Sequence, residues 1–311
     1  MNIWWHIGIL LGFGLVLSTS AQLVVRAALG IAKRAGLTNF TIGFLLLGIV
    51  TSTPEIFVAL QSVLAGIPQL SAGNLLGGSI LLLSFVMGSL ALIRGRVTLT
   101  RGFRWQDMIS TCFVIAAPAF VLWDGALTRG EGIFLIGCYS VHAMLIARDG
   151  KDGTRHGTVA RWRGRWHVIG LLIVGIVGLA IASRMMVQSA ETIIHAFSIS
   201  PVVFGLFFLS IGTNVPELAL AFGALRSKSE DVAVGDFLGS AAANTLILGV
   251  LGLLSPYTAA DPRRVGAALV LLASVTAFFL WSFWTGRTLN RREGFGLLAF
   301  YAIFVAYELF G

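Results

Sequence analysis

"LLLGIVTSTPEIFVAL", residues 45–60, carries a proline and a glutamate in the middle of an otherwise apolar segment. Proline removes a backbone donor and clashes with the preceding turn, so Pro54 predicts a break in a helix. A glutamate beside such a break costs about 3 kcal/mol in lipid unless it is paired, hydrated, protonated or bound to a metal. The stretch therefore predicts a broken membrane helix with a functional carboxylate at Glu55.

The same pattern occurs again later in the chain. "TSTPEIFVA" at 51–59 matches "TNVPELALA" at 213–221, and "AGNLLGGS" at 72–79 matches "VGDFLGSA" at 234–241. Both matches have the same offset of 162 residues. The shared offset indicates two copies of one unit, with Pro216 and Glu217 in the places of Pro54 and Glu55.

The composition indicates a protein that crosses a membrane many times. Of its 311 residues, 57% are apolar and 12% are charged, whereas soluble domains carry about 25% charged residues. The apolar runs match the length that a helix needs to cross the hydrocarbon core of a bilayer. We therefore predict an all-α, polytopic membrane protein with ten transmembrane helices, at residues 4–32, 39–66, 69–93, 106–124, 131–147, 166–193, 199–225, 230–255, 264–286 and 292–311.

The basic residues predict how the helices are oriented. With the N-terminus outside, 17 lysines and arginines fall in inside loops and three in outside loops, as the positive-inside rule requires. This distribution explains the net charge of +8 without a nucleic-acid partner. Five spans before and five after a basic linker make the halves opposite in orientation. The expected domains are therefore two inverted five-helix repeats, 1–147 and 166–311, joined by 148–165.

An inverted repeat brings equivalent residues together near the middle of the membrane. Glu55 and Glu217 would meet there, beside the backbone carbonyls that the prolines free near Thr51 and Thr213. Carboxylate, carbonyl and hydroxyl oxygens form the kind of site that Ca²⁺ prefers. The alternative is that the prolines are packing kinks and the glutamates lie at interfaces.

Polar residues of the second motif fall on the neighbouring spans. Asn74 and Asp236 are either polar groups at helix ends or residues of the ion pathway. Ser240 and Asn244 lie four residues apart, on one face of a helix. That face reaches the site if the third and eighth spans pair with the broken helices.

These residues resemble the alpha-repeats of the cation/Ca²⁺ exchanger superfamily, whose pattern is G-T-S-x-P-E followed by G-N-x-x-G-S-N-I-x-[N/D]. The resemblance covers the whole ten-span layout. It implies exchange of Ca²⁺ for Na⁺ or H⁺ by alternating access. It also implies assignments for individual residues: Glu55 and Glu217 as central Ca²⁺ ligands, Thr51 and Thr213 as carbonyl donors, and Ser52 at a Na⁺ site. We predict that the ion pathway is lined by Ser52, Asn74, Asn214, Asp236, Ser240 and Asn244.

The chain departs from the family pattern at several positions: Val50, Gly78, Leu82, Asn214 and Ala241. Gly78 and Leu82 remove oxygens from the first repeat, and sites built from many oxygens lose affinity when oxygens are removed. A proton does not need several oxygen ligands, so H⁺ is slightly favoured over Na⁺ as the coupling ion. Arg184, which stands 162 residues after Gln22, could pair with Glu191, pair with a site carboxylate, or extend to the interface.

The function that fits best is a Ca²⁺ antiporter in the plasma (inner) membrane of a prokaryote. Two alternatives stay open: a divergent member that moves another cation or solute, and a non-transporting membrane partner. The sequence shows no nucleotide motif, no Ser/His/Asp set and no Cys/His metal spacing, so no enzyme and no cofactor is expected. The expected partners are the lipid bilayer and inorganic cations, and the oligomeric state is left open.

Overall fold

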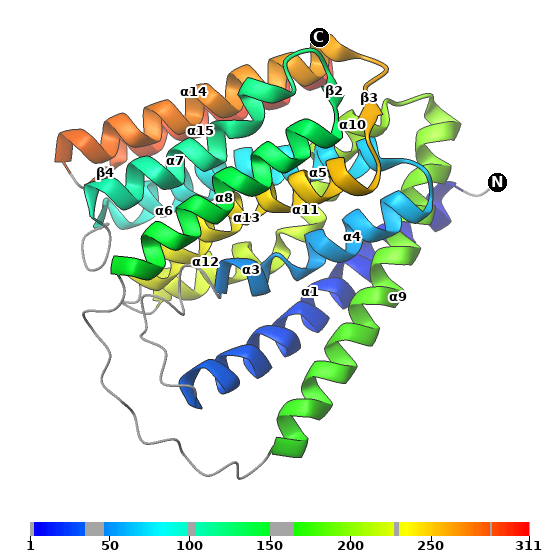
Figure 1. The fold of residues 1–311 in the computed structure, drawn as a ribbon, viewed down its shortest axis with the longest axis horizontal. Coiled ribbons are helices and arrows are strands. Elements are labelled where there is room, and N and C mark those ends of the chain that lie inside the picture. Colours follow the sequence, from blue (N-terminus) through cyan, green and yellow to red (C-terminus); the bar gives the residue numbers. More distant parts are fainter. Residues whose placement is uncertain are drawn as a thin grey trace.

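The computed structural model describes residues 3–34, 47–98, 104–149, 165–226, 230–286 and 288–310, and these are almost entirely helical (Figure 1). The α-helices are α1 (Ile3–Arg34), α3 (Leu47–Thr51), α4 (Thr53–Leu64), α5 (Pro68–Ile80), α6 (Met87–Arg94), α7 (Trp105–Val121), α8 (Arg129–Asp149), α9 (Arg165–Phe197), α10 (Pro201–Phe204), α11 (Ser210–Thr213), α12 (Val215–Arg226), α13 (Glu230–Leu254), α14 (Pro262–Gly286) and α15 (Arg291–Phe310). Two π-helical turns, η2 (Leu81–Val86) and η4 (Gly205–Leu209), continue α5 into α6 and α10 into α11.

Four very short strands form two antiparallel pairs. β1 (Arg96–Thr98) pairs with β4 (Thr288–Asn290), and β2 (Ala126–Leu127) pairs with β3 (Tyr257–Thr258). Each pair joins a strand from the first half of the chain to a strand from the second half. The two halves are therefore tied together at two separate places.

Helices lie in all ten predicted ranges, although residues 39–46 of the second range and most of the linker, 150–164, fall outside the described residues. Six helices of the described part are long and apolar enough to cross a membrane. Pro201–Thr213 and Val215–Leu225, bent by 47°, make a seventh if they are counted as one span. The prediction of a helical, multi-pass membrane protein is confirmed, while the count of ten spans stays a prediction.

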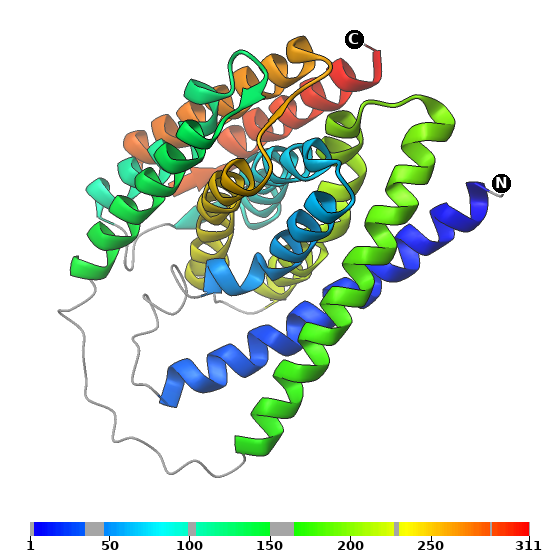
Figure 2. The same ribbon diagram turned by 45° about the vertical axis from the view of Figure 1, so that its right-hand side comes forward.

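The helices form a bundle with two central members. In Pro68–Arg94 and in α13, 78% of the most apolar 18-residue stretch is buried, against 28–44% in the other long apolar helices. α1 and α9 pack against each other along one side of the bundle (Figure 2). The predicted second motifs therefore lie on the two most buried helices, which is where a polar site shielded from lipid has to be.

Glycines let α5 contact the second half at the level of the backbone. A Cβ atom at Gly73 would lie 2.1 Å from the carbonyl oxygen of Val202, and one at Gly77 would lie 2.2 Å from that of Leu206. From the other side, a Cβ atom at Gly205 would lie 2.1 Å from the carbonyl oxygen of Leu70. No side chain fits at these positions, so glycine is what permits this crossing of α5 with α10 and η4.

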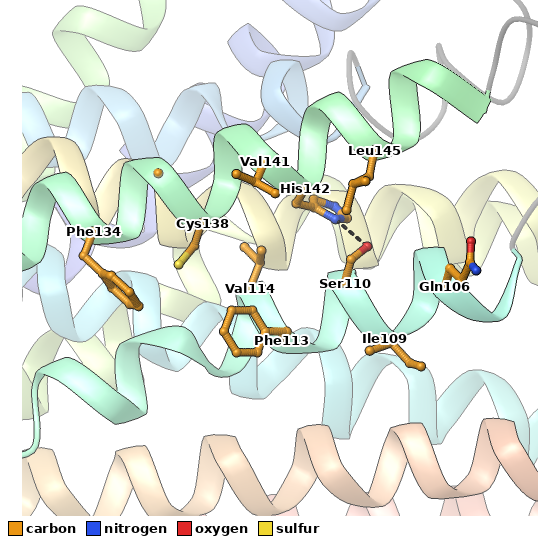
Figure 3. A pocket seen from close by; sticks show the side chains of 11 residues that line it. Gln106, Ile109, Ser110, Phe113, Val114, Phe134, Cys138, Val141, His142 and Leu145 are labelled. Atoms are coloured by element: carbon orange, nitrogen blue, oxygen red, sulfur yellow. Dashed lines mark hydrogen bonds between the residues drawn. The ribbon is translucent and has the colours of Figure 1, made fainter.

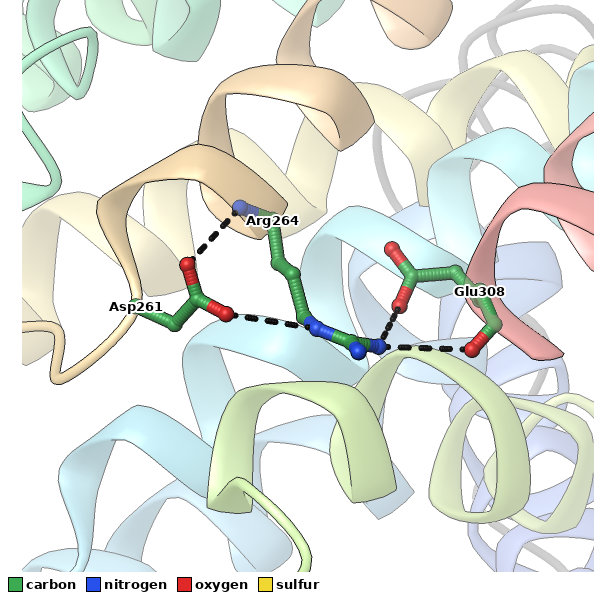
Figure 4. A network of polar contacts seen from close by, with 3 residues as sticks. All are labelled: Asp261, Arg264 and Glu308. Atoms are coloured by element: carbon green, nitrogen blue, oxygen red, sulfur yellow. Dashed lines mark hydrogen bonds and ion pairs between the residues drawn. The ribbon is translucent and has the colours of Figure 1, made fainter. Parts of the chain in front are cut away.

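A polar network joins the start of α14 to the end of α15 (Figure 4). Arg264 Nε lies 3.2 Å from Asp261 Oδ2, and Arg264 Nη1 lies 3.6 Å from Glu308 Oε2. Arg264 Nη1 also donates to the Glu308 carbonyl at 3.3 Å. The side chain of Glu308 is only 1% exposed, so Arg264 is what compensates a buried charge.

Replacing Arg264 by alanine is expected to lower the free energy of unfolding by about 1–2 kcal/mol. Breaking a fully buried pair costs about 3–5 kcal/mol, and the 31% exposure of Arg264 reduces that value through solvent screening. Thermal unfolding of the detergent-solubilised protein measures the change. Arg263→Ala, at the exposed neighbouring arginine, is the matched control, and equal losses in the two variants would contradict a role for the pair.

Candidate functional site

Two helices are interrupted at equivalent positions. Ser52 separates α3 from α4 and has φ −75° and ψ 11°. Asn214 separates α11 from α12 and has φ −89° and ψ 14°. Both residues leave helical geometry in the same way, two positions before a proline. The predicted breaks at Pro54 and Pro216 are confirmed.

The chemistry of proline accounts for the first break. Pro54 has no N–H to give to the carbonyl of Val50, four residues earlier. The hydroxyl of Thr53 donates to that carbonyl instead, at 2.7 Å. The second break has Val215 at the position of Thr53, so its side chain cannot supply the same bond.

The ten residues predicted from the sequence to form the site are all buried. Both carboxylate oxygens of Glu55 and of Glu217 have no hydrogen-bond partner among the described residues, and the same holds for Asp236 Oδ2 and Asn244 Oδ1. Buried polar atoms in proteins are nearly always paired. Six unpartnered oxygens in one buried region are therefore the mark of a site for a positively charged ligand.

One hydrogen-bonded chain runs from Ser240 through Thr51 to Asp236. The hydroxyls of Ser240 and Thr51 lie 2.8 Å apart, and Thr51 donates to Asp236 Oδ1 at 3.0 Å. The Gly48 carbonyl, at 3.3 Å, is a second acceptor for the same proton. Since Thr51 has one hydroxyl proton, Ser240 is the donor in the first pair. This chain joins α3 to α13.

A second hydrogen-bonded chain runs from Asn214 through Thr213 to Asn74. Asn214 Nδ2 donates to Thr213 Oγ1 at 3.3 Å, and Thr213 donates to Asn74 Oδ1 at 3.1 Å. Thr213 and Asn74 stand 162 residues from the positions of Thr51 and Asp236, in the opposite halves. The Thr213–Asn74 contact therefore matches the Thr51–Asp236 contact at the repeat offset.

The carboxyl groups of Glu55, Glu217 and Asp236 lie close enough to repel one another. Thr213 lies beside Glu55 and Ser240 beside Glu217, but each hydroxyl gives its proton to another partner, as described above. Among the described residues, no three His, Cys, Asp or Glu side chains form a ready metal cluster. A cation held here would also need hydroxyl, carbonyl or water oxygens.

Two predicted residues are engaged mainly with neighbouring backbone. Ser52 Oγ donates to the Gly48 carbonyl at 2.8 Å. Asn244 Nδ2 donates to the Leu75 carbonyl at 3.2 Å and to Ser79 Oγ at 3.1 Å. Ser79, which the sequence reasoning did not select, has the Leu75 carbonyl at 3.1 Å and the Ala241 carbonyl at 3.4 Å as acceptors for its one hydroxyl proton. Residues 79 and 241 are 162 apart, so the repeat offset was the signal that could have found this contact.

Arg184 lies outside the site. Its side chain is exposed and makes no ion pair with Glu191 or with a site carboxylate among the described residues. It lines a pocket of about 350 Å³ with Gln61 and Gln188, at the end of α4. Arg184 therefore lies beside the end of α4 and away from the site carboxylates.

A larger cavity of about 710 Å³ lies between α7 and α8 (Figure 3). Apart from Ser110, which hydrogen-bonds to His142 Nδ1 at 2.9 Å, its wall consists mainly of apolar side chains such as Phe113 and Phe134. None of the ten predicted residues contributes to it. The cavity offers no set of oxygens to a cation and is separate from the candidate site.

Comparison with known proteins agrees with the motifs. The family model described as sodium/calcium exchanger protein matches residues 5–147 and 167–310. The inner membrane protein YrbG of Escherichia coli is 28% identical over 88% of this chain and 87% of its own length. CaxA of Alkalimonas amylolytica, named as a candidate antiporter, is 28% identical over 95% of both chains.

The fold is also similar to a solved structure. The sodium-calcium exchanger NCX_Mj, soaked with Na⁺ and Sr²⁺, superposes with a TM-score of 0.70 at 22% identity, covering 98% of this chain and 99% of that one. The family model covers most of the chain, and CaxA and NCX_Mj are named as an antiporter and an exchanger rather than as enzymes. The chain belongs to the sodium/calcium exchanger protein family.

Proposed function

We propose that the protein is a secondary active antiporter that exchanges Ca²⁺ for H⁺ or Na⁺ by alternating access, in the inner membrane of a prokaryote. The observation that carries this proposal is the set of four unpartnered carboxylate oxygens of Glu55 and Glu217, buried between two broken helices. Buried carboxylates without donors need a cation or protons. A transported ion that arrives and leaves supplies such a partner in part of each cycle.

We propose the following ligands for Ca²⁺. Glu55 and Glu217 supply carboxylates, and Thr51 and Thr213 supply backbone carbonyls where the helices break. Asp236 contributes Oδ2, which has no other partner among the described residues. Ca²⁺ takes six to eight oxygens in flexible arrangements, so water would complete the shell.

We further propose ten spans arranged as two inverted repeats, with the N-terminus outside. The matched breaks at Ser52 and Asn214 support this arrangement, and so do the matched chains Thr51–Asp236 and Thr213–Asn74. The two ranges of the family match also fall on either side of the basic linker. The excess of basic residues in the inside loops supports the orientation.

The coupling ion is tested by ⁴⁵Ca²⁺ flux in sealed vesicles that contain the purified protein. We expect flux when a pH gradient is imposed without Na⁺, because a carboxylate can release Ca²⁺ by taking a proton. A Na⁺ gradient at equal pH is expected to drive little flux, since the first repeat lacks oxygens at Gly78 and Leu82. Empty vesicles, and vesicles with both gradients collapsed by ionophores, measure the leak.

Each outcome of this experiment favours one function. Flux driven by Na⁺ alone would contradict proton coupling and would support exchange of Ca²⁺ for Na⁺. Flux under neither gradient would favour the alternative that the protein moves another cation or solute. A protein that also fails to bind any cation would be the non-transporting membrane partner.

A further inference from the structure

The two sides of the candidate site have different chemistry. We use "acid flank" for Ser52, Asp236 and Ser240, and "amide flank" for Asn214, Asn74 and Gly78, their equivalents at the offset of 162. One flank has two serines and a carboxylate, and the other has two carboxamides and a glycine. The amide flank has lost every hydroxyl and every charge that the acid flank carries at these positions.

Asn214 is held in one orientation by two hydrogen bonds. Its Nδ2 donates to the Ser210 carbonyl at 2.8 Å and to Thr213 Oγ1 at 3.3 Å. A carbonyl only accepts, so the bond to Ser210 identifies the nitrogen of the amide. Ser52 makes the equivalent bond, to the carbonyl of Gly48, at 2.8 Å. Both side chains thus donate to the carbonyl four residues earlier, but the asparagine side chain is longer and reaches further across the site.

The amide of Asn214 reaches the place where residue 78 would have a side chain. A Cβ atom at Gly78 would lie 2.8 Å from Asn214 Nδ2 and 3.3 Å from Asn244 Nδ2. An asparagine and a glycine together have as many side-chain heavy atoms as two serines. The two departures from the repeat therefore compensate each other in volume, while they replace two hydroxyl groups with one carboxamide whose Nδ2 faces residue 78.

The N–H groups that point at residue 78 make this flank unsuited to cations. The other amide of the flank, Asn74, has its Oδ1 engaged by the Thr213 hydroxyl, and its buried Nδ2 has no acceptor among the described residues. Cations such as Ca²⁺ and Na⁺ are bound by oxygens, and N–H dipoles repel them. The acid flank, in contrast, keeps Asp236 Oδ2, which no described residue contacts through a hydrogen bond.

We propose that Asn214, seated against Gly78, closes the amide flank to cations, so that the site holds one cation at a time, on the acid flank. This inference rests on the proposed function and adds a specificity-determining residue to it. Asn214 excludes a second cation both by occupying the space and by presenting nitrogen. A pair of serines at 78 and 214 would reopen the flank with the hydroxyls that the other side has.

The test compares four proteins: the parent, Gly78→Ser, Asn214→Ser and the double variant. Thermal unfolding is measured in detergent with Na⁺ replacing choline at constant ionic strength, and separately with added Ca²⁺. We expect Ca²⁺ but not Na⁺ to stabilise the parent. The double variant is expected to gain stabilisation by Na⁺, at Na⁺ concentrations at least about tenfold below any at which the parent responds.

The single variants test the steric part of the proposal. Gly78→Ser alone is expected to lower the unfolding temperature, because the new side chain meets Asn214, and the added Asn214→Ser change is expected to restore it. Gly12→Ser is the matched control, since a Cβ atom at Gly12 has nothing within 4 Å. An equal loss in Gly78→Ser with and without Asn214→Ser would overturn the claim that the two residues share one space.

The Na⁺ measurement decides the claim about ion number. Stabilisation of the parent by Na⁺ to the same degree as the double variant would overturn it, and so would a double variant that gains none. If the double variant does not fold, Asn214→Ser alone, which shortens the side chain and replaces the carboxamide with a hydroxyl, should gain a weaker Na⁺ response, and its absence would overturn the proposal. A parent that Ca²⁺ does not stabilise counts against the proposed function, and the claim about Asn214 is then decided by the Na⁺ response alone.

Discussion

Replacing Glu217 by glutamine is expected to reduce Ca²⁺ flux in vesicles at least about 100-fold, the upper range for loss of a residue that supports a metal. The carboxylate is buried, and neither of its oxygens has a partner among the described residues. Glutamine therefore removes a full negative charge from the site and adds N–H donors. Glu55→Gln is expected to do the same. The measurement is the initial rate of ⁴⁵Ca²⁺ flux under the gradient that drives the parent.

Stability separates a lost ligand from a lost fold. The Glu217 carboxylate is buried, with Glu55 and Asp236 near it. Glutamine removes the buried charge, so the variant without Ca²⁺ should unfold at the same temperature as the parent or higher, while stabilisation by Ca²⁺ disappears. Glu191→Gln, at a glutamate of α9 outside the site, should keep full flux. Full flux in Glu217→Gln would remove that residue from the site.

The second large effect is expected from Gly77→Ala. The added methyl group would lie 2.2 Å from the Leu206 carbonyl oxygen and 2.8 Å from two further backbone atoms of Leu206. Backbone cannot turn aside as a side chain can, so α5 and η4 would have to separate. Overpacking usually costs about 1–3 kcal/mol, and a contact this close to backbone belongs at the upper end or beyond. The yield of monodisperse protein and its unfolding temperature should both fall.

Gly137→Ala is the matched control for this change. Gly137 lies in α8, and a Cβ atom there has nothing within 4 Å. Alanine is the better helix former, so this variant should be as stable as the parent or slightly more stable. If the two alanine variants behaved alike, the close crossing of α5 with the second half would be wrong.

Much of the site could be predicted because its residues occur twice. A proline in an apolar run has one local consequence, and both predicted breaks are present, at Ser52 and Asn214. The shared offset also paired Thr51 with Thr213 and Asn74 with Asp236 as equivalent positions, although the contacts between them were not predicted. The contact of Thr51 with Asp236 and that of Thr213 with Asn74 follow this relation.

Other features depend on contacts that no local pattern encodes. The sequence shows Gly78 and Asn214 as two unrelated departures from the repeat, and only the tertiary structure brings them face to face. The π-helical turns η2 and η4 have no signature in hydrophobic periodicity. Arg184 could not be placed because a long side chain on a long tilted helix can reach several environments, and the end of α4 is one of them.

The glycine crossing of α5 with α10 and η4 has a consequence for how the protein is made. The partners of Gly73 and Gly77 belong to the second half, and the ribosome reaches them on the order of ten seconds after α5. During that delay α5, which carries Asn74 and belongs at the centre of the bundle, lies in the bilayer. The segments of the second half that cover it have not yet been synthesised. A nascent chain that stops at the basic linker should therefore be a substrate for membrane proteases, and the first half should persist only when the second is synthesised soon after it.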